Sequence, residues 1–230
     1  YTDFSGYSDI ARGVAKLFGV ELMQNFNLPY FARSPREFWQ RWHISLSTWL
    51  SDYLYRPLGG NRATLAFTCR NLMLTMILGG LWHGAAWNYV LWGFYQGAVL
   101  TGHRVLRAKV APPCDSSIKA ILKIGGFGVS TWYGWLLFRA RSFSQIETYT
   151  SILLTGRGGL SLDAARPGFS AALGIVLLAG WEIAQYRSRE GPKFYRALPA
   201  PLVGLALAAM VFLTLMGMSN EPAQFIYFQF

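Results

Sequence analysis

The sequence has few charged residues and very little cysteine. Charged residues make up 14% of the 230 positions, whereas an average soluble domain carries about a quarter. Low charge combined with 53% hydrophobic residues excludes a disordered chain and argues against an ordinary soluble enzyme. Two cysteines, Cys69 and Cys114, cannot build a disulfide scaffold, and no metal-ligand spacing surrounds them.

Acidic residues are also scarce, and the motifs of several soluble enzyme classes are missing. Asp and Glu number 11 against 21 Lys and Arg, which gives a net charge of +10. The sequence contains no Gly-x-Ser-x-Gly nucleophile elbow, no P-loop and no histidine spacing suited to a metal. Basic loops beside apolar runs indicate contact with anionic headgroups. We therefore expect membrane lipids as partners, and no nucleic acid.

Long apolar runs are abundant, and they predict an all-α, polytopic membrane helical bundle. One crossing of a bilayer needs roughly 20 apolar residues. Three runs meet this requirement, near 118–138, 169–186 and 198–217. A fourth, 71–103, is almost uncharged but is interrupted by the string GGLWHG. This central stretch is too long for one upright helix and too short for two full ones, so we expect either a tilted helix or a broken pair bent at the glycines.

The segment 34–55 follows a different pattern. Ser34 precedes Pro35, and Glu37 stands three residues after the serine, which is typical of a capped helix start. Aromatic residues and leucines then recur at helical spacing, and most arginines and serines fall on other faces. The pattern predicts an amphipathic helix, rich in Trp and Arg, that lies in the membrane interface.

The distribution of Lys and Arg predicts the membrane topology. Five of these residues fall in 104–123 and four in 187–196, nine in all, against four in 139–166. Because cytoplasmic loops carry the excess of positive charge, we expect the loops in the first two stretches to be cytoplasmic. The side of 31–62 depends on whether 71–103 crosses once or turns back, and its arginines favour the cytoplasmic face.

His83 is the strongest candidate for a catalytic residue among the three histidines. It sits in the middle of the apolar stretch 71–103, where an ionisable side chain is costly and usually functional. A continuous helix would place four residues on one face: Thr75, Gly79, His83 and Trp87. A buried neutral imidazole that faces a substrate hydroxyl is suited to act as a general base. The alternative is an interhelical hydrogen bond with no catalytic role.

The other two histidines have simpler interpretations when they are taken alone. His43 lies on the predicted interfacial helix, where a polar side chain that faces lipid headgroups is the common case. His103 ends the central apolar stretch beside Arg104 and is typical of an interfacial anchor.

Four strings in the sequence resemble one protein family. They are DFSGYSD at 3–9, REFWQRWHISLSTWLSDYLYRPLGGNR at 36–62, NLMLTMILGGLWHGAAWNYVLWG at 71–93 and FIYFQF at 225–230. Together they resemble the membrane-bound O-acyltransferase family, and within it the bacterial alginate O-acetyltransferase subgroup. The resemblance implies a multi-helix membrane enzyme that moves an acyl group onto a hydroxyl.

The resemblance also implies which residues act. His83, in GGLWHG, matches the histidine that lies in the membrane tunnel of the family, and His43, in RWHISLS, matches a second histidine often required for activity. On the same basis, the residues expected to contact substrate or shape the acyl pocket are Trp82, Trp87, Asn88 and Asn71.

The substrates and location follow from the same resemblance. The donor is expected to be acetyl-CoA or another acyl thioester, bound as a substrate and not as a tight cofactor. The acetyl group would pass outward, to an exported polysaccharide such as alginate or to a periplasmic acetyltransferase partner, across the bacterial inner membrane. Five arginines are expected to attract the donor's phosphates, an acidic carrier or lipid headgroups: Arg33, Arg36, Arg41, Arg56 and Arg62.

Members of this subgroup carry further helices before the DFSGYSD string. We therefore expect residues 1–230 to be a single membrane-embedded acyltransferase region, the C-terminal half of a longer chain. Two other functions stay open on the residues alone. One is a transporter-like protein with His83 as a proton relay, and the other is a scaffold that docks a periplasmic acetyltransferase.

Overall fold

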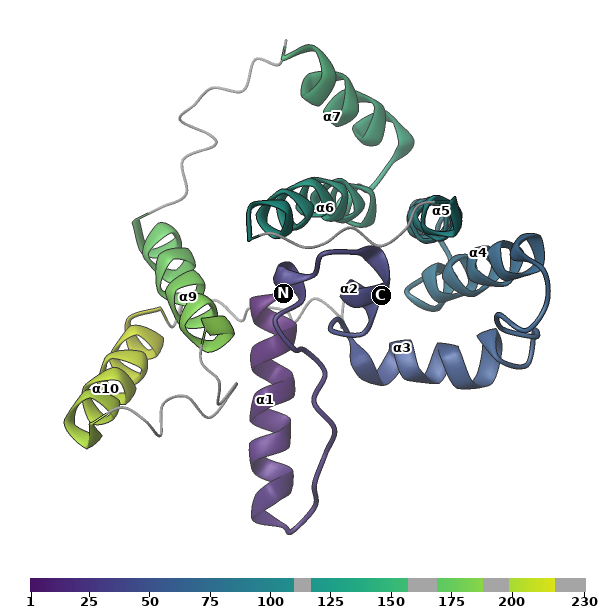
Figure 1. Cartoon of the computed structure of the whole chain (residues 1–230). Coiled ribbons are helices and arrows are strands. Elements are labelled where there is room, and N and C mark those ends of the chain that lie inside the picture. The colour runs from purple at the N-terminus through teal and green to yellow at the C-terminus, as the bar shows by residue number, and fades with distance from the viewer. Residues whose placement is uncertain (110–116, 157–168, 188–198, 218–230) are drawn as a thin grey trace. The chain divides into compact units, whose positions relative to one another are not determined.

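Every regular element that the computed structural model describes is a helix (Figure 1). The structure describes residues 1–109, 117–156, 169–187 and 199–217. The all-α prediction is therefore confirmed for these residues. The chain divides into two compact units, Tyr1–Arg157 and Gly158–Phe230. The string at 225–230 and most of the two loops predicted to be cytoplasmic lie outside the described residues.

Unit 1 contains the candidate functional residues. Its helices are α1 (Thr2–Leu17), the 3-10 helix η1 (Pro29–Phe31), α2 (Pro35–Trp39), α3 (Ile44–Leu50), the π-helix η2 (Ser51–Tyr55), α4 (Leu65–Trp82), α5 (Trp87–Lys109), α6 (Ser117–Arg139) and α7 (Phe143–Thr155). Unit 2 contains α9 (Phe169–Arg187) and α10 (Ala200–Gly217). The helix α7 lies within the stretch 139–166, where the apolar runs predicted no membrane span.

The predicted amphipathic helix over 34–55 is wrong as a continuous element. The helix is capped at Ser34 as expected, because the Ser34 hydroxyl accepts a hydrogen bond from the Glu37 backbone amide at 3.2 Å. The helix then breaks between α2 and α3. At the break, backbone groups of residues 41 and 44 form hydrogen bonds with the segment 25–27. The Asn27 backbone amide donates to the Arg41 carbonyl, and the Ile44 amide donates to the Asn25 carbonyl, both at 2.9 Å. This long-range pairing outweighs the helical periodicity.

The central apolar stretch forms a helical hairpin, which confirms the broken pair over the tilted helix. The helices α4 and α5 pack along each other. The bend lies at residues 83–86, whereas Gly79 and Gly80 are inside α4. Glycines allow the two backbones to approach: a Cβ on Gly93 would come within 2.8 Å of the Ile77 Cα, and one on Gly97 within 3.2 Å of the Met73 Cα. The contacts pair early residues of α4 with late residues of α5, so the helices run antiparallel.

A buried hydrophobic cluster of unit 1 joins α5, α6 and α7. Its buried members are Trp92, Leu137, Ala140 and Ile146. Two tyrosine hydroxyls add polar ties, since Tyr95 donates to the Ser130 carbonyl at 2.9 Å and Tyr133 lies 3.1 Å from the Thr150 hydroxyl. The core fixes α5 against α6 and so holds one side of the hairpin.

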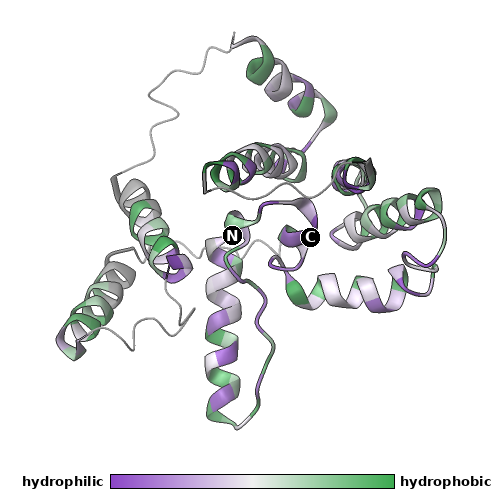
Figure 2. Ribbon diagram, viewed as in Figure 1, coloured by the Kyte–Doolittle hydropathy of each residue, from purple (hydrophilic) through white to green (hydrophobic). Residues whose placement is uncertain are grey.

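One helix of the described residues is long and apolar enough to cross a membrane, namely α4. The three runs predicted as spans form the helices α6, α9 and α10. The segment Ala200–Ala209 at the start of α10 is also apolar but is shorter than a membrane span. Figure 2 shows hydrophobic residues along most of α4, whereas α1 and the chain that follows it are mixed.

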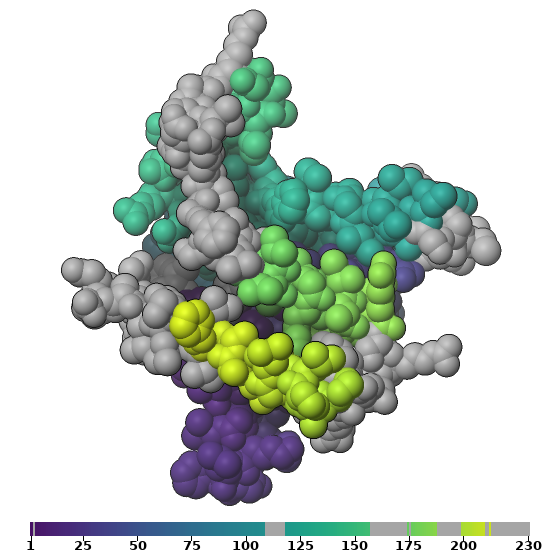
Figure 3. Space-filling view, turned by 90° about the vertical axis from the view of Figure 1, so that its left-hand side faces the viewer, coloured from purple at the N-terminus to yellow at the C-terminus, as the bar shows by residue number. Residues whose placement is uncertain are grey.

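The helix α1 carries much of its apolar surface uncovered. Its C-terminal end stands clear of the rest of unit 1 (Figures 1 and 3). Leu17 and Phe18 there are 86% and 80% exposed. Near the middle of α1, the following chain returns to it through a hydrogen bond that the Asn25 side-chain amide donates to the Ser8 hydroxyl, at 3.4 Å.

Candidate functional site

His83 occupies the turn of the α4–α5 hairpin. It is the C-cap residue of α4, and its amide donates to the Gly80 carbonyl at 2.9 Å. Gly84 follows with φ at +156°, and a Cβ there would lie 2.6 Å from the Tyr89 ring, so the turn requires glycine. The expectation that Trp87 continues the helical face of Thr75 and His83 is wrong, because Trp87 begins the next helix.

An aromatic cluster surrounds the His83 imidazole. Its ring centroid lies 5.3 Å from Trp92, 5.1 Å from Phe138 and 5.0 Å from Trp82, each in an edge-to-face arrangement. The Nδ1 atom is buried and has no hydrogen-bond partner among the residues that the structure describes. A nitrogen in this state is available to a ligand, and apolar surroundings favour its neutral form.

His43 lies at the break between α2 and α3, in a left-handed backbone conformation with φ at 42°. The side chain is 8% exposed. It packs edge-on against Phe4 at 4.8 Å and against Trp82 at 6.0 Å. Burial lowers the pKa of His43 from 6.5 to about 4, so the imidazole is neutral at pH 7. The prediction that His43 faces lipid headgroups does not match this buried position.

The structure brings the two predicted catalytic histidines into one neighbourhood. Trp82 contacts both rings, and the two imidazoles are close enough to interact electrostatically. Nothing in the spacing of the sequence placed them together. The helix α3 begins directly after His43 and the helix α4 ends at His83, and both histidines contact Trp82.

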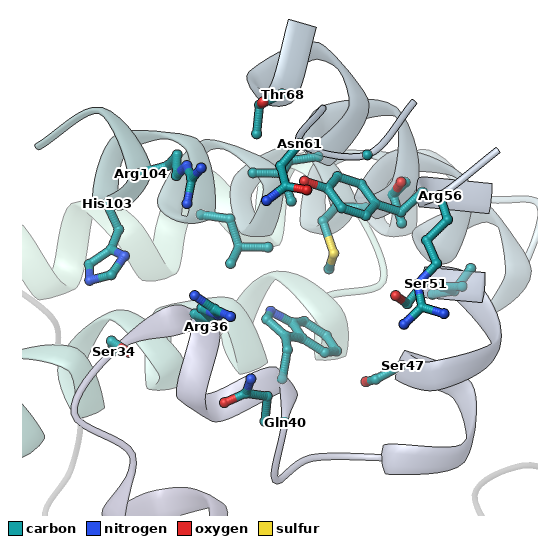
Figure 4. A pocket seen from close by; sticks show the side chains of 18 of the residues that line it. Ser34, Arg36, Gln40, Ser47, Ser51, Arg56, Asn61, Thr68, His103 and Arg104 are labelled. Carbon is teal, nitrogen blue, oxygen red and sulfur yellow. The ribbon is translucent and has the colours of Figure 1, made fainter. Parts of the chain in front are cut away.

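A cavity of about 650 Å³ lies between the α2–α3 segment and the open end of the hairpin. Figure 4 shows Arg36 and Gln40 on one wall and His103 and Arg104 on the other. Five arginines line it: Arg36, Arg56, Arg62, Arg104 and Arg107. Serine and threonine hydroxyls lie among them, and no carboxylate lines the cavity in the described part of the chain.

The cavity is electropositive. Arg56 pairs with Asp52 at 3.0 Å, but the other four arginines have no carboxylate partner within the described residues. Burial raises the pKa of the Tyr55 hydroxyl, and the charges of Arg104 and Arg36 counter part of that rise. Two helices far apart in the sequence therefore direct positive charge to the same place, which suits an anionic ligand.

Aromatic contacts connect the cavity with His83. Trp39 lines the cavity and lies 6.0 Å from Trp92, centroid to centroid. Trp92 in turn contacts His83. Met76 also lines the cavity and lies seven positions before His83 along α4, a rise of about 10 Å.

The remaining predicted site residues lie in different surroundings. Trp82 and Trp87 are 53% and 72% exposed at the turn of the hairpin, and Asn88 is half-buried beside them. Asn71 is 1% exposed and lies near the other end of α4. Its amide nitrogen donates to the Leu58 and Gly60 carbonyls, both at 3.0 Å, and its oxygen accepts two hydrogen bonds from the adjacent Arg70. The role of Asn71 as a substrate contact stays a prediction.

Sequence reasoning missed several residues of this region. Trp39 and Trp92 were not among the predicted site residues, and His103 was expected to anchor the interface but lines the cavity. The alternation of Trp with Arg around position 40 was the available signal for Trp39. Nothing pointed to Trp92, because its place beside His83 depends on the hairpin. The described residues contain no group of three His, Cys, Asp or Glu that would hold a metal.

The candidate site is thus a helical hairpin with a half-buried histidine at its turn and an arginine-lined cavity at its open end, a charge distribution that suits an anionic ligand. The family model of the membrane-bound O-acyltransferases matches residues 1–143. The chain therefore belongs to the membrane-bound O-acyltransferase family, and it is a membrane protein.

Relatives give the comparison finer detail. The chain is 44% identical over 191 residues to a probable alginate O-acetylase AlgI of Azotobacter vinelandii, covering 83% of the chain and 38% of that protein. It is 49% identical over 142 residues to a probable alginate O-acetylase AlgI of Pseudomonas aeruginosa, covering 62% and 26%. A peptidoglycan O-acetyltransferase of Helicobacter pylori is 39% identical over 164 residues, covering 70% and 30%. The chain thus spans well under half the length of these relatives.

Proposed function

We propose that the protein is an O-acyltransferase that moves an acetyl group from a cytoplasmic thioester to hydroxyls of an exported polysaccharide such as alginate. The observation that carries the proposal is the arrangement at the hairpin. His83 keeps a buried nitrogen without a partner at one end, and a basic cavity lies at the other end. The names of the relatives, which describe O-acetylation of alginate and of peptidoglycan, support the same reaction class.

His83 acts as the general base in this proposal. The reaction needs a hydroxyl made more nucleophilic, and a neutral imidazole in an apolar site can accept its proton. The aromatic cluster excludes water, which would otherwise hydrolyse the thioester. His43 contributes from the other side of Trp82, and Trp82, Trp87 and Asn88 shape the pocket that receives the acyl group.

The cavity holds the phosphates of the donor. Acetyl-CoA and carrier-bound thioesters both present phosphate groups, and guanidinium groups bind phosphate strongly. Arg36 and Arg104 lie on facing walls (Figure 4) and have no competing carboxylate within the described residues. The donor binds as a substrate that is released after each turnover.

The hairpin accounts for transfer across the membrane. Eighteen residues make α4 about 27 Å long, close to the apolar thickness of a bilayer. Because α5 returns antiparallel to α4, the segment 31–62 and the C-terminal end of α5 lie on the same side of the hairpin, and their arginines favour the cytoplasm for that side. The turn with His83 then faces outward, toward the polysaccharide or a periplasmic acetyltransferase. The location is the bacterial inner membrane, with several crossings.

The test of the proposed function is acetyl transfer by the full-length protein in membranes. Wild type, His83→Ala and the exposed control Thr148→Ala would be supplied with a labelled acyl thioester and alginate. We expect His83→Ala to lose transfer while its membrane level equals that of the control. Equal transfer by all three proteins would reject the role of His83 and the function that rests on it.

A further inference from the structure

Four buried nitrogen atoms of unit 1 have no hydrogen-bond partner among the described residues. They are Nδ1 of His83 and the indole Nε1 atoms of Trp39, Trp92 and Trp135. Buried polar groups in folded proteins are nearly always paired, so each exception needs an explanation. An indole N–H can only donate, which means that three of the four positions require an oxygen or another acceptor that these residues do not supply.

Trp92 is the most constrained of the three indoles. It is 2% exposed and belongs to the core that joins α5, α6 and α7. Its ring stands perpendicular to the His83 imidazole, with an interplanar angle of 89° and a centroid distance of 5.3 Å. The buried Trp92 N–H, which has no acceptor among the described residues, therefore lies in direct contact with the His83 imidazole, whose Nδ1 also has no partner among them.

We propose that Trp92 is a catalytic hydrogen-bond donor whose Nε1–H binds the carbonyl oxygen of the acyl group beside His83. This inference rests on the proposed function, because it needs an acyl thioester at that place. It adds a second chemical role to the site: His83 handles the proton, and Trp92 handles the negative charge that develops on the carbonyl oxygen.

The step balances without any further reactant. His83 accepts the proton of the acceptor hydroxyl, and the hydroxyl oxygen forms a C–O bond to the thioester carbonyl carbon. The electron pair of the C=O bond moves to the oxygen, where the Trp92 N–H stabilises it. Collapse of this intermediate restores C=O and breaks the C–S bond, and the leaving thiolate takes the proton from His83.

The surroundings suit this role. Phe138 contacts both His83 and Trp92, so the donor lies in apolar surroundings where a hydrogen bond to an anionic oxygen is stronger than in water. Because the core fixes Trp92, the donor needs no reorganisation when charge develops. The unsatisfied N–H of the free protein is then a cost to folding that is recovered when the acyl group binds.

Trp135 supplies a matched control. Its indole N–H is also buried and unpartnered, but its ring contacts are with Phe38, Trp42 and Phe138, and none is with His83. Replacement of either tryptophan by phenylalanine removes the N–H and keeps an aromatic ring. Both variants therefore lose one buried indole N–H. They differ in that the Trp92 ring contacts His83 and the Trp135 ring does not.

The experiment measures kcat and KM for acyl transfer with the full-length protein in membranes, for wild type, His83→Ala, Trp92→Phe and Trp135→Phe. We expect Trp92→Phe to lower kcat on the order of 100-fold, the effect of losing one oxyanion donor, with KM unchanged. Trp135→Phe should keep the wild-type kcat. The thermal midpoint of Trp92→Phe should equal that of Trp135→Phe, since each loses one unsatisfied donor.

The pH profile separates a donor to the substrate from a residue that merely holds His83. If Trp92 donated to His83, its loss would raise the basicity of the imidazole and move the acid limb of the kcat profile to higher pH. We expect a lower profile with an unmoved limb. A moved limb, or a kcat of Trp92→Phe within twofold of wild type while His83→Ala is inactive, would overturn the role of Trp92 alone. Equal rates in wild type and His83→Ala would overturn the proposed function itself.

Discussion

His43 and His83 stand 40 residues apart in the sequence and pack against the same indole ring, that of Trp82. Both histidines lie where a helix is interrupted. His43 precedes α3 in a left-handed conformation, and His83 ends α4 at the turn of the hairpin. Each imidazole is therefore held by backbone geometry as well as by its aromatic neighbours.

The stability of the protein should depend on pH through His43. Burial lowers its pKa from 6.5 to about 4, so the folded state binds fewer protons than the unfolded state between these values. The contribution of neutral His43 to the free energy of unfolding is fully present above about pH 6.5. It decreases as the pH falls toward 4, by up to about 3 kcal/mol. The measurement is the thermal midpoint of the detergent-solubilised protein over this range.

His43→Asn provides the control for this pH effect. Asparagine tolerates the left-handed conformation that His43 adopts and does not titrate. Because His83 is present in both proteins, the difference between their pH curves reports His43 together with its electrostatic interaction with His83. Parallel curves for wild type and His43→Asn would show that burial of His43 has no energetic consequence.

The hairpin should not tolerate a side chain at Gly93. A Cβ there would come within 2.8 Å of the Ile77 Cα on the opposite helix, and a backbone cannot move aside as a flexible side chain can. We expect Gly93→Ala to lower the free energy of unfolding by about 1–3 kcal/mol or more. Gly102→Ala, on the same helix with open space around it, should be neutral or slightly stabilising. Equal thermal midpoints for the two variants would contradict the close packing of α4 and α5.

Asn71 should be required for stability. Its side chain bonds the Leu58 and Gly60 carbonyls, and Gly60 lines the basic cavity. Asn71→Leu should leave both carbonyls without this donor and cost about 2–3 kcal/mol. The measurement is the thermal midpoint, with Thr148→Ala as the exposed control. Unchanged stability together with a raised KM for the acceptor would instead support the predicted contact with substrate.

The basic cavity should control donor affinity and not the chemical step. Arg104→Gln removes one unpaired charge from the wall, so we expect KM for the acyl thioester to rise about tenfold with kcat nearly unchanged. Arg141→Gln removes an equal charge from an exposed position before α7 and should leave both constants as they are. The effect of Arg104→Gln should shrink at high salt, because screening weakens the same attraction in the wild type. An equal change in both variants would assign the effect to net charge.

The short-range signals of the sequence were the accurate ones. Ser34 caps α2 as its spacing with Glu37 predicted, and the runs near 118–138, 169–186 and 198–217 are helices. The signals failed where distant segments compete for the same hydrogen bonds. The amphipathic pattern continued through 40–43, but the backbone there bonds residues 25–27, which no local periodicity can register.

The sequence by itself determined the all-helical fold of the described residues and the family, and it singled out His83 as a candidate, because apolar run length, sequence motifs and an ionisable residue within an apolar run are local properties. Only the tertiary structure decided that the central stretch turns back on itself, since the turn needs Gly84 and the close contact needs Gly93 opposite Ile77. That turn brings Arg104 to Arg36 around one cavity and Trp92 to His83. Such contacts join residues far apart in the chain, and their energies depend on packing that no single segment contains.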